Sequence, residues 1–428
     1  MTRAAILNAF SPAQQVTDPA AFAGRSSEIR EVADAMQVTG ACPVIYGDKG
    51  LGKSSLAVQA QLIAMGDTQL LNDIGANQWI IPSESTFVTI YVTCTDEIRT
   101  FVDLRLLILH EIEKVRLLPD GDTGTSNLAQ RYTSKILNPE STKEYEGRSR
   151  DLRSEELSPT ERLRREIQLI NETTHQPILI IVDELDRARD TTGLASFLKV
   201  MSGPTTKFLL VGIGQTLSDL HLDHPSLERQ VMPIRVPRMT SGELADIVDR
   251  AVRKLAATGQ NYTFHPDART RLVRLAAGFP WFVHVIGQAA LLLALARGEN
   301  EVSDDILIIA ARELVKNRFA QNFKDAYQIA VRDSYQREIV LRVFAAWRGG
   351  EIPTSKVYPV CQALGVINPA VYRGHLTAEH YGEPLIVPGY QQRGLLRFRN
   401  EMFKQYVTLT DSLFTDVDED VRKATTAW

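Results

Sequence analysis

The chain has 428 residues, of which 44% are hydrophobic and 23% charged, enough for two or three packed domains. Its formal net charge of −4 excludes a globally basic nucleic-acid-binding protein, so any basic surface has to be local. The three cysteines lack metal-site spacing, the sequence shows no secretory leader pattern, and no apolar run approaches the ~20 residues that span a bilayer. We therefore expect a cytoplasmic protein without membrane contact.

In chain order, the sequence predicts an extension on the surface, a core in which strands alternate with helices, a purely helical lid, a mixed unit and an acidic tail. The alternation predicts an α/β fold, a parallel sheet with helices on both faces. Within the core, residues 119–158 are rich in Gly, Ser, Thr and charge and predict a partly mobile insertion. The five predicted segments are residues 1–20, 21–240, 241–335, 336–410 and 411–428.

Short apolar runs with β-branched residues predict the strands of the core, and spacing of three and four predicts the helices. The predicted strands are 42–46, 86–92, 178–182, 207–213 and 232–236. The predicted helices of the lid are 241–257, 265–277, 280–296 and 304–330.

A complete phosphate loop of the pattern G-x-x-x-x-G-K-S stands between the first predicted strand and a predicted helix. Its glycines let backbone N–H groups surround a phosphate, and the helix directs its positive end at the same anion. We expect Lys53 to reach the β- and γ-phosphates, Ser54 to bind Mg²⁺, and Ser55 to lie in the same site. The sequence therefore predicts ATP binding. The loop consists of Gly47, Asp48, Lys49, Gly50, Leu51, Gly52, Lys53 and Ser54.

A second acidic motif follows the predicted strand 178–182, where Asp183 and Glu184 end an apolar run. A buried parallel strand delivers such carboxylates at its C-terminal edge. We expect Asp183 to hold Mg²⁺, directly or through water, and Glu184 to orient and deprotonate the attacking water. Taken alone, the motif also fits a buried strand that ends in a solvated turn.

Together these motifs resemble the AAA+ and STAND branch of P-loop ATPases, closest to the origin-recognition and signal-transduction types. The resemblance covers residues 20–320 and implies ATP or ADP with Mg²⁺ as cofactors. Gly24 and Arg25 match the F-x-G-R box, which helps hold the adenine in that family. Gln215, at the tip of the fourth predicted strand, matches the sensor 1 position, where a polar side chain contacts the γ-phosphate and the lytic water.

The predicted lid agrees with the family at one motif and departs from it at another. Pro280 completes a G-x-P motif like that of STAND lids, which implies a contact with the nucleotide. The sensor 2 arginine of typical AAA+ lids has no counterpart, because Trp281 stands at about its position and the nearest polar side chain is His284. This departure favours a slow switch over a fast motor. His284 is interpreted as a hydrogen-bonded histidine of an apolar helix, with a nucleotide contact as the alternative.

Arg229 closes a segment that resembles the arginine-finger region of clamp-loader-like AAA+ proteins. The resemblance implies a homo-oligomer in which Arg229 stabilises phosphate charge in the site of a neighbouring subunit. The alternative is a surface arginine paired with a nearby acid.

The unit at 336–410 predicts a winged helix, with three helices followed by a hairpin. It holds nine Lys/Arg against five Asp/Glu, so it is locally positive. Four arginines on the third helix and the wing are candidates for tracking the phosphates of duplex DNA. The competing interpretation is a protein-contact or autoinhibitory surface, as in many STAND proteins. The four residues are Arg373, Arg393, Arg397 and Arg399.

Two functions therefore compete. The first is an ATP-hydrolysing molecular switch whose nucleotide state controls assembly or binding of a protein effector, for example in bacterial stress or anti-phage signalling. The second is an ATP-dependent DNA-binding loader or regulator of the replication or transposition type. In both, the expected catalytic residues are Lys53, Glu184, Gln215 and Arg229.

Overall fold

The computed structural model describes two compact units. One, the sheet unit, is Ala13–Met239, and the other joins Met1–Pro12 with Thr240–Trp428. The predicted insertion lies outside the described residues except at its last two positions. The described residues are 2–116, 157–214, 216–220, 222, 227, 229–315, 321–347, 350–387, 394–413 and 425.

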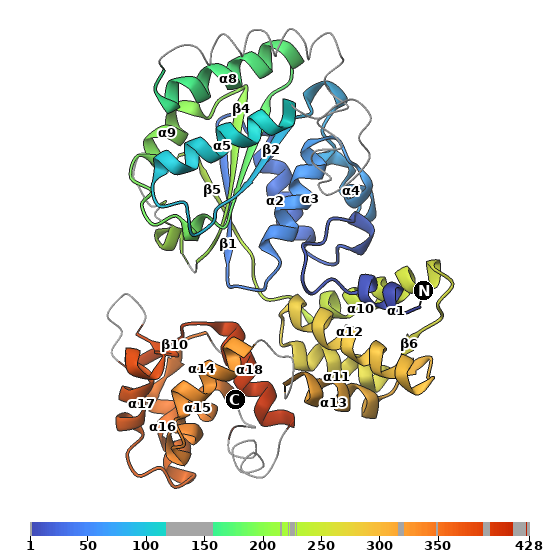
Figure 1. Cartoon of the computed structure of the whole chain (residues 1–428), viewed down its shortest axis with the longest axis vertical. Coiled ribbons are helices and arrows are strands. Elements are labelled where there is room, and N and C mark those ends of the chain that lie inside the picture. Colours follow the sequence, from blue (N-terminus) through green and yellow to red (C-terminus); the bar gives the residue numbers. More distant parts are fainter. Residues whose placement is uncertain are drawn as a thin grey trace. The chain divides into compact units, whose positions relative to one another are not determined.

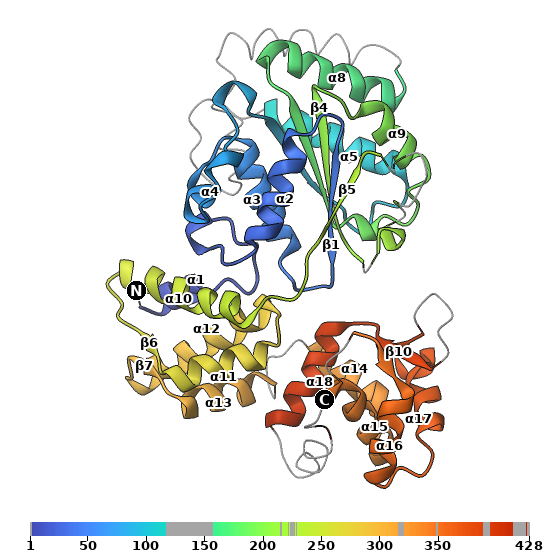
Figure 2. The same ribbon diagram turned by 180° about the vertical axis from the view of Figure 1, so that it is seen from behind.

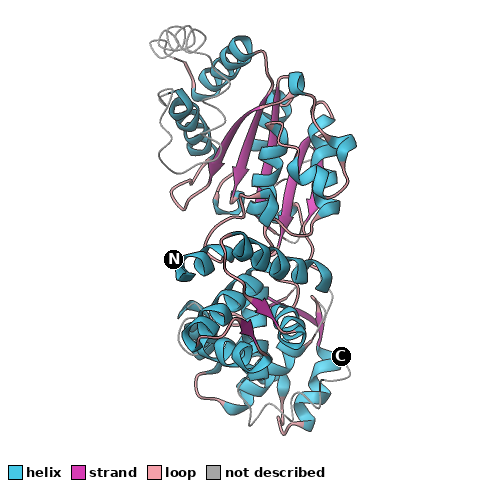
Figure 3. Ribbon diagram, turned by 90° about the vertical axis from the view of Figure 1, so that its right-hand side faces the viewer, coloured by secondary structure: helices cyan, strands magenta, loops and turns pink. Residues whose placement is uncertain are grey.

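The sheet unit is built on five parallel strands in the order β2-β3-β4-β1-β5 (Figure 1). The arrows of this sheet run in one direction (Figure 3), so the loops that follow its strands gather at one edge. All six residues of β3 are buried, which explains its continuous apolar run. The predicted α/β parallel-sheet core is confirmed. Its strands are β1 (Cys42–Gly47), β2 (Val88–Thr93), β3 (Ile178–Asp183), β4 (Thr206–Ile213) and β5 (Val231–Arg235).

Helices cover both faces of the sheet (Figures 1 and 2). One face carries α2 and α3, which contact each other and β1, and the other carries α5, α8 and α9. This division follows from right-handed crossovers between parallel strands. The short helix α4 follows α3. The bounds are α2 (Ser26–Gln37), α3 (Lys53–Ala64), α4 (Gln69–Asp73), α5 (Phe101–Arg116), α8 (Pro159–Thr174) and α9 (Leu194–Met201).

The lid consists of four helices and two two-residue strands. The first helix begins with a capping box, in which Thr240 and Glu243 each accept the other's backbone N–H. The third, α12, is long and apolar enough to span a membrane by length and composition alone, yet it packs against α1, α10, α11 and α13. The elements are α10 (Ser241–Ala257), β6 (Thr263–Phe264), α11 (Pro266–Ala276), α12 (Pro280–Arg297), β7 (Glu301–Val302) and α13 (Asp304–Glu313).

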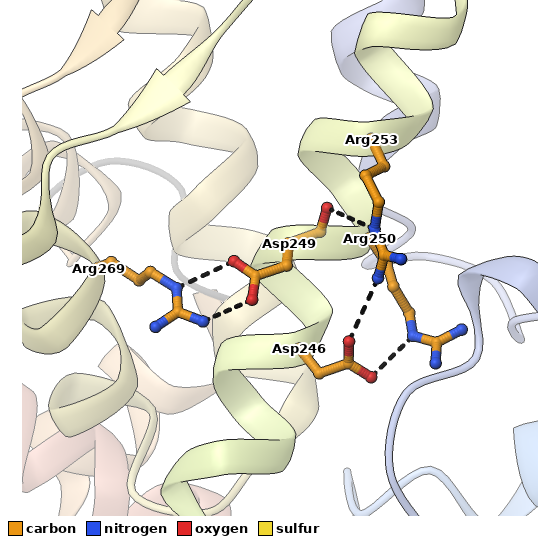
Figure 4. A network of polar contacts seen from close by, with 5 residues as sticks. All are labelled: Asp246, Asp249, Arg250, Arg253 and Arg269. Carbon is orange, nitrogen blue, oxygen red and sulfur yellow. Dashed lines mark hydrogen bonds and ion pairs between the residues drawn. The ribbon is translucent and has the colours of Figure 1, made fainter. Parts of the chain in front are cut away.

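A network of ion pairs joins α10 to α11 (Figure 4). Asp249 accepts two hydrogen bonds from the guanidinium of Arg269, at 3.0 and 2.5 Å. Along α10, Asp246 accepts from Arg250 at 2.7 Å and from Arg253 at 3.4 Å. The side chains of Asp249 and Arg269 are 49% and 38% exposed, so each pair contributes only about 0.2–1 kcal/mol. The network orients the two helices, and apolar burial holds them together.

The N-terminal extension differs from its prediction. The expected surface segment begins with a helix, α1 (Thr2–Ala9), and two of its apolar side chains, Ile6 and Phe10, are fully buried in the second unit. The ring of Phe10 lies so close to α12 that a Cβ at Gly287 would come within 2.6 Å of it. Three buried apolar residues in the first ten, Ile6, Ala9 and Phe10, are too few to form a visible helical pattern.

The C-terminal part has the element order expected of a winged helix, in which β8, β10 and β9 form an antiparallel sheet. The helix predicted at 304–330 is instead two helices, α13 and α14, and α14 packs on α15 and α18. The elements are α14 (Gln321–Val331), α15 (Tyr335–Ala346), β8 (Ile352–Pro353), α16 (Thr354–Ala363), α17 (Pro369–Leu376), β9 (Leu385–Ile386), β10 (Leu395–Phe398) and α18 (Glu401–Leu413).

Candidate functional site

The phosphate loop leaves β1 at Gly47 and enters α3 at Lys53. At Gly47 (φ 151°) a Cβ would lie 2.6 Å from the carbonyl oxygen of Val236, so only glycine fits there. Gly52 (φ 88°) is the N-cap residue of α3 and, being glycine, offers no side chain to cap this helix. Its first-turn N–H groups are therefore donors for an anion.

The side chain of Lys53 is buried in the loop, 7% exposed, and donates to the carbonyl oxygen of Asp48 at 2.8 Å. Burial lowers the pKa of Lys53 to about 8, and the negative charges of Asp186, Asp183, Asp48 and Glu184 oppose that decrease. The ammonium group thus lies among carboxylates, and the phosphate loop and the acidic motif meet in one place. Such an excess of negative charge suits a divalent cation that accompanies a phosphate ligand.

Asp183 is held at both carboxylate oxygens. Oδ1 accepts the backbone N–H of Glu184 at 2.8 Å, and Oδ2 accepts the hydroxyl of Tyr91 at 2.7 Å. Burial above all, and then the charge of Asp183, raises the pKa of Tyr91, so its hydroxyl stays protonated and donates. The sequence analysis missed Tyr91. Its only signal was a polar atom within the predicted strand 86–92, next to the strand that ends at Asp183.

Glu184 adopts a left-handed backbone conformation (φ 54°) directly after β3, which is uncommon for a residue other than glycine. Its carboxylate accepts from Nε of Arg187 at 2.5 Å. Arg187 also contacts Asp96 at 3.4 Å. Glu184 and Arg187 are each about two-fifths exposed, at 40% and 42%. The expected general base is therefore ion-paired, and the sequence analysis did not single out Arg187.

The loop after β3 is fastened to the end of β4, because Asp186 accepts the backbone N–H of Ile213 at 2.7 Å. Gln215, the predicted sensor 1 residue, lies just beyond this contact and outside the described residues. Arg229, the predicted arginine finger, is exposed on a turn before β5. An exposed arginine fits both an arginine finger and a surface arginine, so the finger role of Arg229 stays a prediction.

Arg25 braces the backbone of the phosphate loop. Its guanidinium donates to the carbonyl oxygen of Leu51 and to Glu28, both at 3.0 Å, and Arg25 and Glu28 are 3% and 4% exposed. Gly24 and Arg25 both have positive φ, 64° and 63°, which turns the chain into α2. The adenine contact that the resemblance implied for these two residues stays a prediction.

The segment before this turn contacts the helix of the phosphate loop. The backbone N–H of Val16 donates to the hydroxyl of Ser55 at 3.0 Å, and Gln59 donates to the carbonyl oxygen of Val16 at 2.9 Å. The hydroxyl of Ser55, predicted as part of the nucleotide site, thus accepts from the protein backbone beside Ser54.

The lid residues belong to the other unit. Pro280 is the first residue of α12, and Trp281 donates its indole N–H to the carbonyl oxygen of Pro12 at 2.9 Å. His284 accepts the backbone N–H of Ser11 at Nδ1, at 3.2 Å. Burial, with a smaller contribution from Lys254, lowers the pKa of His284 to about 4. The interpretation of His284 as a hydrogen-bonded histidine of an apolar helix is confirmed.

The candidate DNA-contacting arginines differ in their surroundings. Arg399 is paired with Glu383. Arg373 and Arg397 are partly buried, and Arg393 lies outside the described residues. The pairing occupies the guanidinium of Arg399, so this arginine is less available to a phosphate than the sequence analysis expected.

Comparisons with known proteins found similar folds. No family model and no curated protein matches the chain. The ORC2 protein of Aeropyrum pernix, solved as ADPNP–ADP complexes, is 17% identical, with 94% of each chain covered and a TM-score of 0.49. Cdc6p of Pyrobaculum aerophilum is 13% identical, with 98% of each chain covered and a TM-score of 0.45. RuvB of Thermotoga maritima, a Holliday junction branch migration motor, is 13% identical, covering 88% of this chain and 93% of its own, with a TM-score of 0.40.

These TM-scores all lie below 0.5, so both the fold and the roles of single residues have to come from the geometry of this chain. That geometry combines a five-stranded parallel sheet, a phosphate loop after β1 and two acids after β3. The sheet unit therefore has an α/β fold of the P-loop type.

Proposed function

We propose that the chain is an ATP-hydrolysing molecular switch. The observation that carries this proposal is the buried ammonium group of Lys53, held in the phosphate loop among the carboxylates of Asp183 and Glu184. Bound phosphate would replace the carbonyl oxygen of Asp48 as the acceptor for Lys53, and the uncapped N–H groups of α3 would donate to the same anion.

The side chains of Ser54 and Asp183 fit Mg²⁺, because a hydroxyl and a carboxylate are the hard oxygen donors that this ion prefers. Among the described residues, no group of three or more His, Cys, Asp and Glu side chains could hold a metal ion, so phosphate oxygens and water have to complete the coordination. Bound Mg²⁺ would neutralise charge on the β- and γ-phosphates.

Hydrolysis by this site is expected to be slow. Glu184 would deprotonate the attacking water, but its carboxylate already accepts from Nε of Arg187, so this contact has to open before the carboxylate can accept from the water. In the lid, Trp281 stands at the sensor 2 position and neutral His284 supplies no charge. Arg229 of a neighbouring subunit is the proposed remaining source of positive charge. The ATPase rate should then rise more than linearly with protein concentration, and Arg229→Ala should abolish that rise.

Two substitutions test the site. Lys53→Ala should weaken binding of a fluorescent ATP analogue about 100-fold, because it removes a charged hydrogen-bond donor to phosphate. Glu184→Gln should bind the analogue normally but lose about 10²–10⁴-fold in hydrolysis, because it removes the base. Lys199→Ala, at an exposed position of α9, is the control and should leave both properties unchanged. Normal affinity in Lys53→Ala would show that the site is wrongly assigned.

The surface of the C-terminal part has features that favour two different partners. Its excess of Lys/Arg favours duplex DNA, and this gives the second candidate function, an ATP-dependent DNA-binding regulator. The paired Arg399 and two exposed apolar side chains, Ile367 (87%) and Val371 (48%), favour a protein effector instead. Mobility shifts of duplex DNA at two salt concentrations separate the two, because phosphate contacts require a steep loss of affinity with salt. Absence of binding at low salt would leave the protein effector.

A further inference from the structure

We propose that Tyr91 is a positioning residue, whose hydroxyl fixes the carboxylate of Asp183 in the orientation that receives Mg²⁺. The inference rests on the ATPase function proposed above. It starts from the register of the sheet, in which Tyr91 of β2 lies beside Ile181 of β3 and Thr93 beside Asp183. Tyr91 is therefore two positions before the residue that pairs with Asp183, on the same face as that residue, and its long side chain reaches forward to Oδ2.

The two hydrogen bonds to Asp183 act together. A carboxylate held at one oxygen can still rotate about its terminal bond, whereas donors at both oxygens fix its plane. The backbone N–H of Glu184 supplies one donor and Tyr91 the other. Each oxygen keeps a further lone pair, so the carboxylate stays able to bind Mg²⁺ or a water molecule on it. A hydroxyl that donates to a carboxylate at 2.7 Å forms a charge-assisted bond, stronger than a neutral one.

The hydroxyl and the aromatic ring of Tyr91 have separate roles. The ring of Tyr91 forms an apolar body that is partly buried in β2. Phenylalanine would supply that body. The oxygen of Tyr91 bonds Asp183 and also has a side-chain hydrogen bond with Gln15, so Tyr91→Phe removes the positioning contact together with the Gln15 contact and leaves the ring.

Removal of this contact should weaken metal binding and leave metal-free nucleotide binding unchanged. Loss of a hydrogen bond that orients a metal ligand typically lowers metal affinity 10–100-fold. We therefore expect the Mg²⁺ concentration at half-saturation, measured with a bound fluorescent ATP analogue, to rise about 10-fold in Tyr91→Phe. The affinity for the analogue in EDTA should equal that of the wild type, because Lys53 and the loop backbone are unaltered.

The matched control is Tyr327→Phe in the other unit. There the hydroxyl of Tyr327 also donates to a carboxylate, Oε1 of Glu338, at the same distance of 2.7 Å. Both variants lose one oxygen bonded to an acid, so a general loss of stability would appear in the thermal unfolding of both. A shift in the Mg²⁺ dependence is expected for Tyr91→Phe alone.

The experiment titrates each full-length protein with the analogue in EDTA and then with Mg²⁺. If the wild type binds no analogue, the proposed function fails, whatever the variants do. If the wild type responds to Mg²⁺ and Tyr91→Phe responds at the same concentration, the role of Tyr91 is refuted and the ATPase proposal stands. An equal loss of affinity in EDTA and in Mg²⁺ would assign Tyr91 a structural role and also overturn the inference.

Discussion

The contact between the N-terminal segment and the lid should make the protein sensitive to mild acid. His284 is partly buried, and its Nδ1 already accepts the backbone N–H of Ser11. A proton at Nδ1 would break this bond and place a charge in an apolar site beside Phe10, whose ring meets the imidazole edge-on. The folded protein therefore resists protonation of His284, and burial lowers its pKa from 6.5 to about 4.

The magnitude follows from the two pKa values. As pH falls below 6.5, the unfolded chain binds the proton first, so the free energy of unfolding decreases until the folded protein also binds it near pH 4. At pH 5 the unfolded imidazole is almost fully charged and the folded one about one-tenth charged. The corresponding loss of stability is about 2 kcal/mol, at 1.36 kcal/mol for each tenfold difference.

Urea unfolding at pH 7.5 and pH 5, followed by tryptophan fluorescence, measures this loss. Trp281 reports on the region because its indole contacts Pro12. His284→Asn keeps a hydrogen-bond acceptor but cannot be protonated, so it should lose about 2 kcal/mol less than the wild type between the two pH values. His265→Asn, at the exposed N-cap histidine that precedes α11, keeps a capping acceptor and should behave like the wild type. Equal losses in His284→Asn and wild type would refute the reasoning.

Two further predictions concern the packing around a glycine of α12 and a buried ion pair. Gly287→Ala should destabilise by about 1–3 kcal/mol and expose the N-terminal segment to limited proteolysis, because the new Cβ would meet the ring of Phe10. Gly242→Ala, a helical glycine with open space around it, should be neutral or stabilise by up to about 1 kcal/mol. Arg25→Ala should cost about 3–5 kcal/mol in chemical unfolding, because it leaves Glu28 buried without its charge partner. The double variant Arg25→Met/Glu28→Leu should recover most of that loss, and no recovery would exclude an unpaired charge as the cause.

The elements of the site that were predicted correctly depend on short-range sequence patterns. The phosphate loop has fixed spacing, and β3 is a continuous apolar run that ends in two acids, so both were visible without knowledge of any distant contact. The sequence analysis predicted the parallel sheet but no order of its strands, which the structure gives as β2-β3-β4-β1-β5.

The features that were missed depend on partners far apart in the chain. Tyr91 lies 92 positions from Asp183, and nothing in its own strand indicates a bond to that carboxylate. Arg187 is close to Glu184 in sequence, but their pairing depends on the left-handed backbone of Glu184, which the residue type does not favour. Arg25 was assigned from a family motif, whereas its buried contact with Leu51 depends on the turn at Gly24.

The packing of α1 on α12 also bears on the order of folding. Ser11 and His284 are 273 positions apart, so the ribosome needs roughly 14–55 s between them at 5–20 residues per second. During that interval α1, an eight-residue helix, is too short to be stable in water, and Ile6 and Phe10 stay exposed. The lid therefore completes its core only when a segment made long before it returns to α12.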